Sequence, residues 1–428
     1  MRDTFALSFT RGRSRVLQAA LLAALGLLAS SLAPAEASEA GSGWVSAWST
    51  GLMTADAAHP PPFAQGPTTV RQVVRLTGGG KRVRLRLSNA FGSGPLQIDA
   101  ARLALSSKPK SAAIDPSSVR KVTFDGRDWV IIPPGAVYLS DPVDMPVAPL
   151  ARLAVTLQFP VAPPGATIHR AARTTTYLAA GADPSAADLP AAATILQWLQ
   201  LSAVEVENPK AVVIAAFGDS ITDGSGTRDN SYQRWPDLLA ERLQADPKRR
   251  HWAIINAGIG GNRLLKDGLS PSGLARLDRD ALSLPGVQTL IVLIGVNDIG
   301  FVSREGPVTP DTRQVVVEGL KSGYRQVVER AHARGVRVVG ATILPFGGAK
   351  AYRSDADADA DRQAVNDWIR TSGVFDAVID LDAVVRDQDR PATLRAEYDS
   401  GDHLHPSPAG YRAIADAIPL DLLVARRR

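Results

Sequence analysis

The sequence predicts a two-domain α/β protein in which an antiparallel β-sandwich precedes a parallel sheet with helices on both faces. Three observations favour this fold class. The chain has 428 residues, a length that suggests two domains. In residues 38–208, apolar and polar residues alternate within short segments, the pattern of strands that bury one face. In residues 209–428, continuous apolar runs alternate with helical patterns, which is the order expected for a parallel sheet.

The first element is a predicted signal peptide, residues 1–37. Three arginines within Arg11–Arg15 precede the apolar run Val16–Leu28, and Ala35-Glu-Ala37 has the form of a signal-peptidase site. The apolar run is too short for a comfortable membrane span. The chain has no cysteine, which excludes disulfides and thiol catalysis. We therefore expect an exported protein, periplasmic or extracellular, with no stable membrane span once the signal peptide is removed.

The second element is the predicted β-sandwich of residues 38–208. Polar and apolar residues alternate in Lys81–Leu87 and in Leu153–Gln158. Glycine- and proline-rich turns such as Gly78–Gly80 and Pro133–Gly135 separate these strands. We find no candidate catalytic set in this part of the chain, and we interpret its tryptophans mainly as core residues.

The third element, residues 209–428, begins with the apolar run Ala211–Phe217, which predicts a buried strand. Ser220 follows the end of this strand, and ligands bind at that edge in open parallel sheets. Taken alone, Gly218-Asp-Ser220 is typical of a turn or a helix N-cap. The next residues, Ile221-Thr-Asp-Gly224, lack the second glycine of the Gly-x-Ser-x-Gly elbow of α/β-hydrolases. A serine nucleophile here therefore needs a different fold.

Two further predicted strands, Trp252–Asn256 and Thr289–Ile294, lead to residues that could stabilise a developing oxyanion. Gly261 offers a backbone N–H in a glycine-rich turn, where the absence of a Cβ lets a substrate approach closely. Asn297 offers a side-chain N–H. With the Ser220 amide these make three candidate donors, each worth on the order of 3 kcal/mol. Each segment taken alone also has an ordinary turn composition.

A base and its orienting group are predicted near the C-terminus. A serine hydroxyl is a weak nucleophile unless a base accepts its proton, and that base must be held in one tautomer. Asp402 and His405 are close enough in sequence for one turn of chain to join carboxylate and imidazole. A helix over Pro408–Leu420 follows, with Ser407 as its N-cap. We interpret His403 as an exposed neighbour without a catalytic role.

Together these segments resemble the SGNH, or GDSL-type, esterase and acylhydrolase family, over roughly residues 211–421. The resemblance implies a flavodoxin-like three-layer α/β/α domain and hydrolysis of carboxylic esters through an acyl-serine intermediate. No cofactor is required for this reaction. Asp402, His403 and His405 could also ligate a metal ion, but the serine constellation already accounts for two of them, so we expect no metal ion. Ile221 stands where the family name has a leucine, a swap that nearly conserves volume.

The same resemblance implies the role of each site residue. The catalytic triad is Ser220, Asp402 and His405, and the oxyanion hole is formed by Ser220, Gly261 and Asn297. The Asn-x-Gly-x-x-Gly spacing of the family selects Gly261 rather than the preceding glycine.

The two-domain organisation also resembles exported bacterial members of this family that are grouped with xylanase-cluster esterases. Trp44–Trp48 near the mature N-terminus and Gly401–Pro406 near the end carry this resemblance. It implies an acylated carbohydrate as the ester substrate, from which acetyl or other short acyl groups are removed. Three alternatives stay open: a lipid acylhydrolase or lipase, an acyltransferase, and a carbohydrate-binding protein whose β domain does the biological work.

Charge gives no indication of a nucleic-acid partner. The formal net charge is +5, and residues 1–37 contribute four arginines and two acids to it. The basic end Arg426–Arg428 is interpreted as a solvated tail. Acids alternate in Asp355–Asp361 as at the start of an EF-hand calcium loop, but Ala360 and Asn366 stand where that loop needs glycine and glutamate. We expect a solvated loop or a helix start there, and the oligomeric state stays open.

Overall fold

The computed structural model describes Met1 and residues 43–423, apart from residues 57, 59, 191, 305–307 and 351. The predicted signal peptide, apart from Met1, and the basic tail Arg426–Arg428 lie outside the described residues. Within the described part, no helix combines the length and the apolar character needed to cross a membrane.

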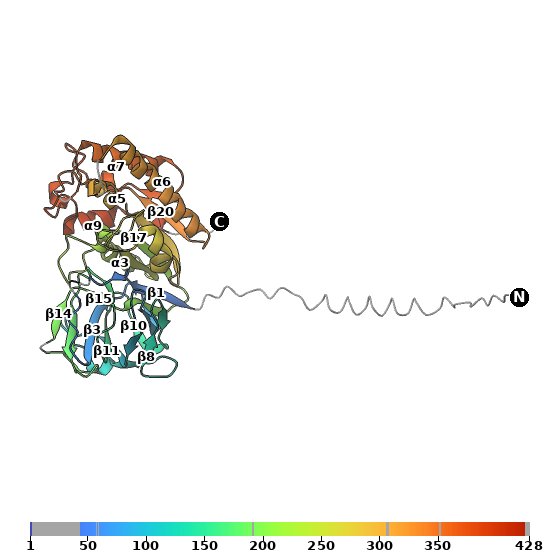
Figure 1. The fold of residues 1–428 in the computed structure, drawn as a ribbon, viewed down its shortest axis with the longest axis vertical. Helices are drawn as coiled ribbons and strands as arrows, with labels where there is room; N and C mark the ends of the chain where they lie inside the picture. Colours follow the sequence, from blue (N-terminus) through green and yellow to red (C-terminus); the bar gives the residue numbers. More distant parts are fainter. Residues whose placement is uncertain are drawn as a thin grey trace. The chain divides into compact units, whose positions relative to one another are not determined.

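Antiparallel strands build the N-terminal β region, which we define as residues 44–207 (Figure 1). The strands are β1 (Trp44–Ser49), β2 (Met53–Thr54), β3 (Thr68–Arg75), β4 (Gly80–Ser88), β5 (Leu96–Ile98), β6 (Ala100–Leu105), β7 (Arg120–Val122), β8 (Val130–Ile132), β9 (Val137–Leu139), β10 (Val143–Val147), β11 (Arg152–Phe159), β12 (Thr167–His169), β13 (Thr176–Ala180), β14 (Ala193–Ile195), β15 (Trp198–Leu199) and β16 (Leu201–Glu207). One sheet has the order β1-β16-β4-β10, with β9 beside β4, and another has the order β14-β13-β3-β11-β6-β7. Two smaller sheets are β15-β12-β2 and β5-β8.

Alternation along the strands explains why the two larger sheets pack together. In β4, Val83 and Leu85 are buried in the core that the sheets share. Arg84 and Arg86 alternate with these residues and point to the other face, where both guanidinium groups pair with the buried carboxylate of Glu205 in β16. The predicted one-face burial of Lys81–Leu87 is therefore confirmed.

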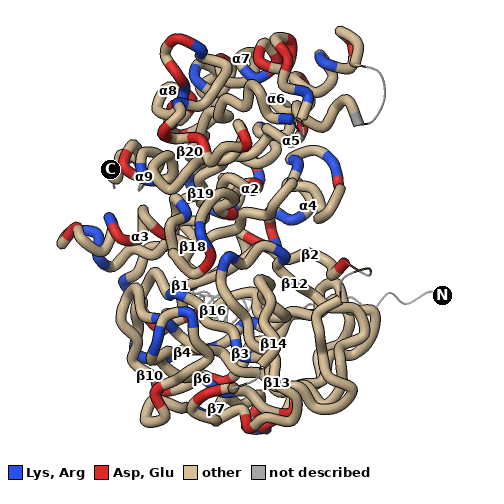
Figure 2. Tube along the Cα trace, turned by 90° about the vertical axis from the view of Figure 1, so that its left-hand side faces the viewer, with Lys and Arg blue, Asp and Glu red and all other residues tan. Residues whose placement is uncertain are grey.

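A parallel sheet with the order β18-β17-β19-β20-β21 forms the α/β region, which we define as residues 212–423. Its strands are β17 (Val212–Gly218), β18 (Trp252–Gly258), β19 (Val287–Leu293), β20 (Arg337–Ala341) and β21 (Ala377–Ile379), and its helices are α2 (Ser220–Asp223), α3 (Trp235–Ala245), α4 (Gly273–Leu277), α5 (Val296–Gly300), α6 (Pro310–His332), α7 (Ala356–Thr371), α8 (Leu381–Val385) and α9 (Pro408–Ala417). The predicted fold class, an antiparallel region followed by a parallel sheet with helices, is confirmed. Positive and negative residues are interspersed over both regions in Figure 2.

One helix start that the sequence left open is resolved by the structure, and one helix end differs from the sequence prediction. The acidic run predicted as a loop or helix start is a helix start, because the Asp355 side chain accepts a hydrogen bond from the Ala358 N–H and caps α7. The last predicted helix ends at Ala417 rather than Leu420. Pro419 accounts for the earlier end, because a residue that precedes proline is disfavoured in helical conformation.

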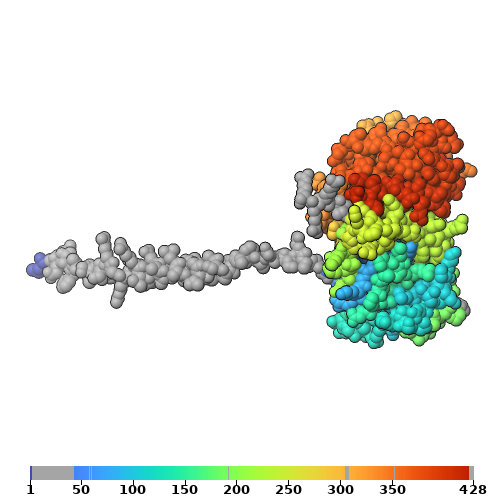
Figure 3. All heavy atoms as spheres, turned by 180° about the vertical axis from the view of Figure 1, so that it is seen from behind, coloured from blue at the N-terminus to red at the C-terminus, as the bar shows by residue number. Residues whose placement is uncertain are grey.

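The β region covers the edge strand β18 of the parallel sheet. Strand β1 packs against β18, and the Thr77 hydroxyl both donates to the Ile254 carbonyl at 2.8 Å and accepts from the Ile254 N–H at 3.1 Å. On the face seen in Figure 3 the two regions adjoin each other directly, and residues from Gly43 onward form one compact unit. The boundary predicted at residues 208 and 209 falls between β16 and β17. That each side is an independent domain stays a prediction.

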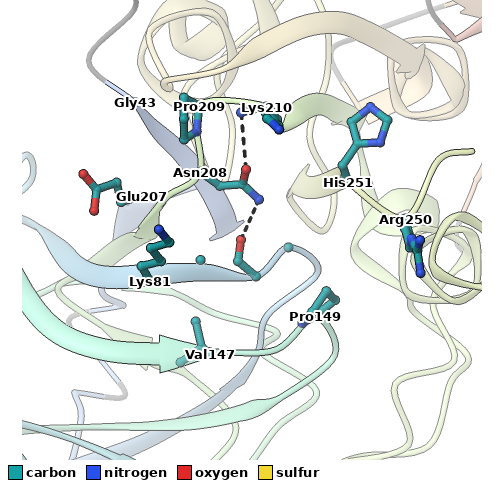
Figure 4. A pocket seen from close by; sticks show the side chains of 13 residues that line it. Gly43, Lys81, Val147, Pro149, Glu207, Asn208, Pro209, Lys210, Arg250 and His251 are labelled. Carbon is teal, nitrogen blue, oxygen red and sulfur yellow. Dashed lines mark hydrogen bonds between the residues drawn. The ribbon is translucent and has the colours of Figure 1, made fainter. Parts of the chain in front are cut away.

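A cavity of about 620 Å³ lies where the two regions join (Figure 4). Asn208 bridges part of its wall, since its amide nitrogen donates to the Gly79 carbonyl and its amide oxygen accepts from the Lys210 N–H. Lys210 lies two residues before the start of β17, and His251 in the same wall directly precedes β18. The cavity therefore opens at the amino edge of the parallel sheet, opposite the edge that carries Ser220.

Candidate active site

Ser220 is the first residue of α2, directly beyond the carboxyl end of β17. The Asp219 side chain caps this short helix by accepting a hydrogen bond from the Ile221 N–H at 3.0 Å. Gly218 is required by crowding, because a Cβ there would lie 2.2 Å from the Thr222 hydroxyl and 2.4 Å from the Leu293 carbonyl oxygen. The predicted placement of Ser220 at a strand end is therefore what the structure shows.

Asp402 and His405 lie next to Ser220 at the carboxyl edge of the parallel sheet. The Ser220 Oγ and the His405 Nε2 are 2.8 Å apart, and the His405 Nδ1 is 2.6 Å from the Asp402 Oδ2. The other Asp402 oxygen accepts the backbone N–H groups of Leu404 and His405. The structure thus brings together the three side chains predicted as a triad.

The electrostatics of this contact fix the tautomer of His405. Burial by itself raises the pKa of Asp402, but hydrogen bonds from the His405 side chain and from backbone N–H groups hold its pKa well below the ordinary value. Asp402 is therefore a carboxylate at neutral pH and only accepts hydrogen bonds. The His405 Nδ1 must donate to it, which leaves the Nε2 lone pair for the Ser220 hydroxyl.

His403 makes a second, separate pair. Its Nδ1 is 2.6 Å from the Asp399 Oδ2, and its side chain is 52% exposed. Its backbone is left-handed, with φ of 62°, which sets its side chain apart from that of His405 in the same loop. The exposure expected for His403 is what the structure shows.

The glycine-rich turn after β18 presents two neighbouring amides that differ in their partners. The Gly260 N–H donates to the Asp223 Oδ2 at 3.2 Å. Among the described residues, no hydrogen bond from the Gly261 N–H is found, and Gly261 has the left-handed φ of 72° that favours glycine. The amide of Gly261, the predicted oxyanion donor, is therefore the one left to receive a ligand.

Asn297 lies in α5, just beyond β19, and is fully buried. Its Nδ2 donates to the Asn262 carbonyl at 2.9 Å, and its Oδ1 accepts the Tyr352 hydroxyl at 2.5 Å. A carbonyl oxygen only accepts, so the contact with Asn262 fixes which end of the amide is nitrogen. The second hydrogen of the Asn297 Nδ2 therefore remains available to an oxyanion. Asn297 is the side chain that the sequence predicts as an oxyanion donor.

Three supporting residues were missed by the sequence analysis. Tyr352 orients Asn297, and its ring stacks on Phe301 with centroids 4.7 Å apart. Asp298 accepts the backbone N–H groups of Leu264 and Leu265, and burial raises its pKa to about 6. Arg276 is the third. Tyr352 and Arg276 stand in segments without a recognisable sequence pattern. For Asp298, its position next to Asn297 was a signal that it belongs to the site.

Arg276 is hydrogen-bonded to the ends of two parallel strands next to the site. Its guanidinium donates to the carbonyls of Gly218 and Ala257, both at 2.7 Å, and to the Asn262 side chain at 2.9 Å. Burial lowers its pKa to about 10, and the nearby carboxylate of Asp280 opposes this change. At neutral pH the group therefore stays charged and links the ends of β17 and β18 to the oxyanion turn.

In the part of the chain that the structure describes, no group of three or more histidine, aspartate or glutamate side chains is arranged to hold a metal ion. The polar atoms of the site instead pair with one another, and they form a proton path that ends at the Ser220 hydroxyl.

Comparisons with known proteins place the site in a family. Residues 216–413 match the model of the GDSL-like lipase/acylhydrolase family, while no protein among the curated sequences matches the chain. Solved structures similar to this chain include an acetyl xylan esterase (21% identity, 48% of this chain and 97% of the other, TM-score 0.37). Others are a GDSL-like lipase from Bacteroides thetaiotaomicron (19%, 49% and 87%, TM-score 0.35) and an aryl esterase from M. smegmatis (17%, 48% and 95%, TM-score 0.37). The segment matched by the family model spans the strand ends and the loop that carry the site, so this part of the chain belongs to the GDSL-like lipase/acylhydrolase family and the protein is a carboxylic ester hydrolase.

Proposed function

We propose that the protein hydrolyses esters through an acyl-enzyme formed on Ser220, with His405 as the base and Asp402 as its orienting group. One observation carries this proposal. The three side chains form a continuous hydrogen-bonded path, 2.8 Å from Ser220 Oγ to His405 Nε2 and 2.6 Å from His405 Nδ1 to Asp402 Oδ2. These distances are those required of a nucleophile and its base.

The reaction proceeds in two halves. The Ser220 oxygen attacks the ester carbonyl while its proton passes to the His405 Nε2, and the resulting oxyanion is held by the amides of Ser220 and Gly261 and the Asn297 side chain. The protonated His405 then gives its proton to the departing alcohol, and the acyl group stays on Ser220. Water, activated by the same histidine, attacks the acyl-serine and releases the acid.

We propose a hydroxyl-rich alcohol, such as a carbohydrate, as the leaving group, and acetyl or another short acyl group as the part transferred to serine. The side of the site next to His405 is polar and open to water. Asp402 is 51% exposed and His403 is 52% exposed. A carbohydrate keeps most of its hydroxyl groups hydrated when it is bound at such an open polar rim.

A second candidate, a lipid acylhydrolase, is favoured by a different side chain. Leu269 is 57% exposed, and its Cδ1 would lie 3.6 Å from a Cβ placed on Gly261. An apolar group at the oxyanion turn could contact a longer acyl chain. The two candidates therefore predict opposite preferences for acyl-chain length.

Export to the periplasm or the medium completes the proposal. It is supported by the signal-peptide pattern of residues 1–37, and fractionation of cells that express the full chain tests it. Recovery of the uncleaved chain in the cytoplasm alone would contradict it.

The decisive experiment is a hydrolysis panel with p-nitrophenyl acetate, butyrate, octanoate and palmitate, together with acetylated xylan. Wild-type enzyme should prefer the acetate and release acetate from xylan. Ser220→Ala should lose nearly all turnover and keep its stability within about 1 kcal/mol, since this hydroxyl contributes little to packing. Near wild-type turnover by this variant would refute the serine mechanism.

Two additions separate the alternatives. Leu269→Ser should leave acetate turnover unchanged, and a selective loss of octanoate turnover in this variant would support the lipid acylhydrolase. Assays that include a sugar or glycerol acceptor distinguish hydrolysis from acyl transfer by the product. A carbohydrate-binding protein without esterase function would bind xylan equally well with Ser220→Ala and would show no turnover in the wild type.

A further inference from the structure

We propose that His169, a residue of the N-terminal β region, positions the oxyanion turn of the active site through Asp223. The proposal rests on the function proposed above for Ser220 and Gly261. It assigns to the β region a part in the catalytic geometry, beyond covering the sheet edge.

Asp223 joins the nucleophile segment to the oxyanion turn. It is the last residue of α2, which begins with Ser220, and it is buried. Its Oδ2 accepts the Gly260 N–H at 3.2 Å. The turn also lies directly on the helix backbone, because a Cβ on Gly258 would come within 2.3 Å of the Asp223 nitrogen.

His169 supplies the other partner of this carboxylate. Its Nε2 is 3.0 Å from the Asp223 Oδ1, and its Nδ1 is 2.7 Å from the Gly51 carbonyl oxygen. A carbonyl oxygen only accepts, so Nδ1 carries a hydrogen and donates to Gly51. The Nε2 lies within hydrogen-bond distance of the Asp223 carboxyl group, so the ring joins Asp223 to the Gly51 carbonyl.

Burial makes this arrangement demanding. The side chain of His169 is 2% exposed and that of Asp223 is 3% exposed. A buried polar group that loses its partner costs about 1–3 kcal/mol, and more when it is charged. Because both ring nitrogens of His169 and both oxygens of Asp223 are engaged, the three contacts hold a single geometry.

The β region also packs on the turn directly. A Cβ on Gly51 would lie 2.6 Å from the Ile259 Cγ1, so the segment between β1 and β2, whose Gly51 carbonyl contacts His169, packs directly on the oxyanion turn. Figure 2 shows β2 and β12, the strands next to Gly51 and at His169, on the side of the β region that faces the α/β region. The turn is thus held between α2 and the β region.

This contact bears on the proposed oxyanion donor because the peptide unit that carries the Gly260 N–H directly precedes the one that carries the Gly261 N–H. Glycine has little intrinsic preference in φ and ψ, so the turn depends on outside contacts for its geometry, and the hydrogen bond to Asp223 anchors the peptide unit next to the oxyanion donor. Loss of the His169 contact frees the Asp223 carboxylate to turn. Donors displaced by about 1 Å can lower the rate about 10²-fold.

A matched pair of substitutions tests the proposal in the full-length protein. A glutamine amide reaches about as far as imidazole Nε2, whereas an asparagine amide reaches about as far as Nδ1. His169→Gln keeps a donor for Asp223, and His169→Asn keeps only the donor for Gly51. We expect His169→Asn to lower kcat for p-nitrophenyl acetate by about 10-fold or more, with little change in KM, and His169→Gln to stay within about threefold.

A second measurement reports on the oxyanion hole itself. A thionoester places sulfur where the oxyanion would form, and sulfur accepts hydrogen bonds from aligned donors poorly. An intact oxyanion hole therefore prefers the oxygen ester strongly. We expect this preference, the ratio of the two kcat/KM values, to fall in His169→Asn and to be retained in His169→Gln. Asp223→Asn, which keeps the shape of the side chain and loses one acceptor, should also lower the ratio.

The control for stability is Gln72→Ala. Gln72 is buried in the same β region, and its amide joins both the N–H and the carbonyl of Leu199. This variant should lower Tm and leave the ester preference unchanged. Equal losses of preference in Gln72→Ala and His169→Asn would overturn the proposal, as would wild-type kcat and preference in both His169→Asn and Asp223→Asn. The two failures can be told apart. Wild-type turnover in Ser220→Ala would refute the proposed function itself. An inactive Ser220→Ala together with wild-type kinetics in His169→Asn would refute only the role of His169.

Discussion

The hydroxyl group of Tyr352 offers a direct test of how the oxyanion donor is oriented. Tyr352→Phe removes the hydrogen bond to the Asn297 Oδ1, which is 2.5 Å long, and retains the ring that stacks on Phe301. Because Asn297 is fully buried, its oxygen would lose a partner without gaining access to bulk water. That loss costs about 1–3 kcal/mol.

Only part of this cost should reach the transition state. The Asn297 Nδ2 keeps its bond to the Asn262 carbonyl, so the amide turns less freely than after loss of both contacts. If about 1 kcal/mol appears in the barrier, kcat falls roughly fivefold. Asn297→Ala removes the donor itself and should lower kcat by about 10²–10³-fold, with a much smaller change in KM.

Steady-state kinetics with p-nitrophenyl acetate and thermal unfolding, applied to both single variants and the double variant, measure these effects. The hydroxyl of Tyr352 acts through Asn297, so the double variant should be no slower than Asn297→Ala alone, a strongly non-additive result. Wild-type kcat in Tyr352→Phe would refute the reasoning, and so would fully additive losses. Thermal unfolding of Tyr352→Phe should show a loss of stability of about 1–3 kcal/mol, the cost of one buried acceptor without a partner.

Three further predictions concern the histidines, the helix cap and the strand end. His405→Ala should abolish turnover and His403→Ala should spare most of it, and activity of the wild type should rise with pH as the base loses its proton; the opposite behaviour of the two variants would show that the wrong histidine was assigned. Burial raises the pKa of Asp219 from 3.8 to about 7, so the folded state binds this proton more tightly than the unfolded state and the stability present below about pH 4 is lost as pH rises to about 7. The shift corresponds to at most about 4 kcal/mol of stability. Asp219→Asn carries no charge at either pH, so the Tm of this variant minus the Tm of the wild type should be larger at pH 8 than at pH 4. Equal Tm differences at the two pH values would contradict the burial argument. Gly218→Ala should fail to fold or lose nearly all activity, because its Cβ would collide with Thr222 and with a strand carbonyl, and a stable, active variant would show that this end of the strand can relax.

The parts of the site that the sequence predicts share one property. Ser220, Gly261 and Asn297 follow apolar runs of parallel strands, so their place at one sheet edge comes from the periodicity. Asp402 and His405 are close in sequence and therefore close in space. Local patterns of this kind are visible in a single chain because each needs only a few neighbouring residues.

The residues that hold the donors in place do not have this property. Tyr352 stands in a loop far in sequence from Asn297, and Arg276 reaches three carbonyl or amide oxygens from a short helix. His169 lies in another region of the chain altogether. Their contacts depend on how distant segments pack, and neither composition nor spacing carries that information.

The packing of the β region against the edge strand β18 affects how the chain folds during synthesis. Residues 44–207, which include β1 and Thr77, are synthesised before the parallel sheet, and domains that emerge first generally fold first. When β18 forms, the surface that accepts its outer edge is therefore already present. A sheet edge that stays unpaired during synthesis is a template for joining other chains. We therefore expect the order of the two regions along the chain to protect the nascent hydrolase from aggregation, and a permuted gene that places residues 212–423 first should yield more insoluble protein.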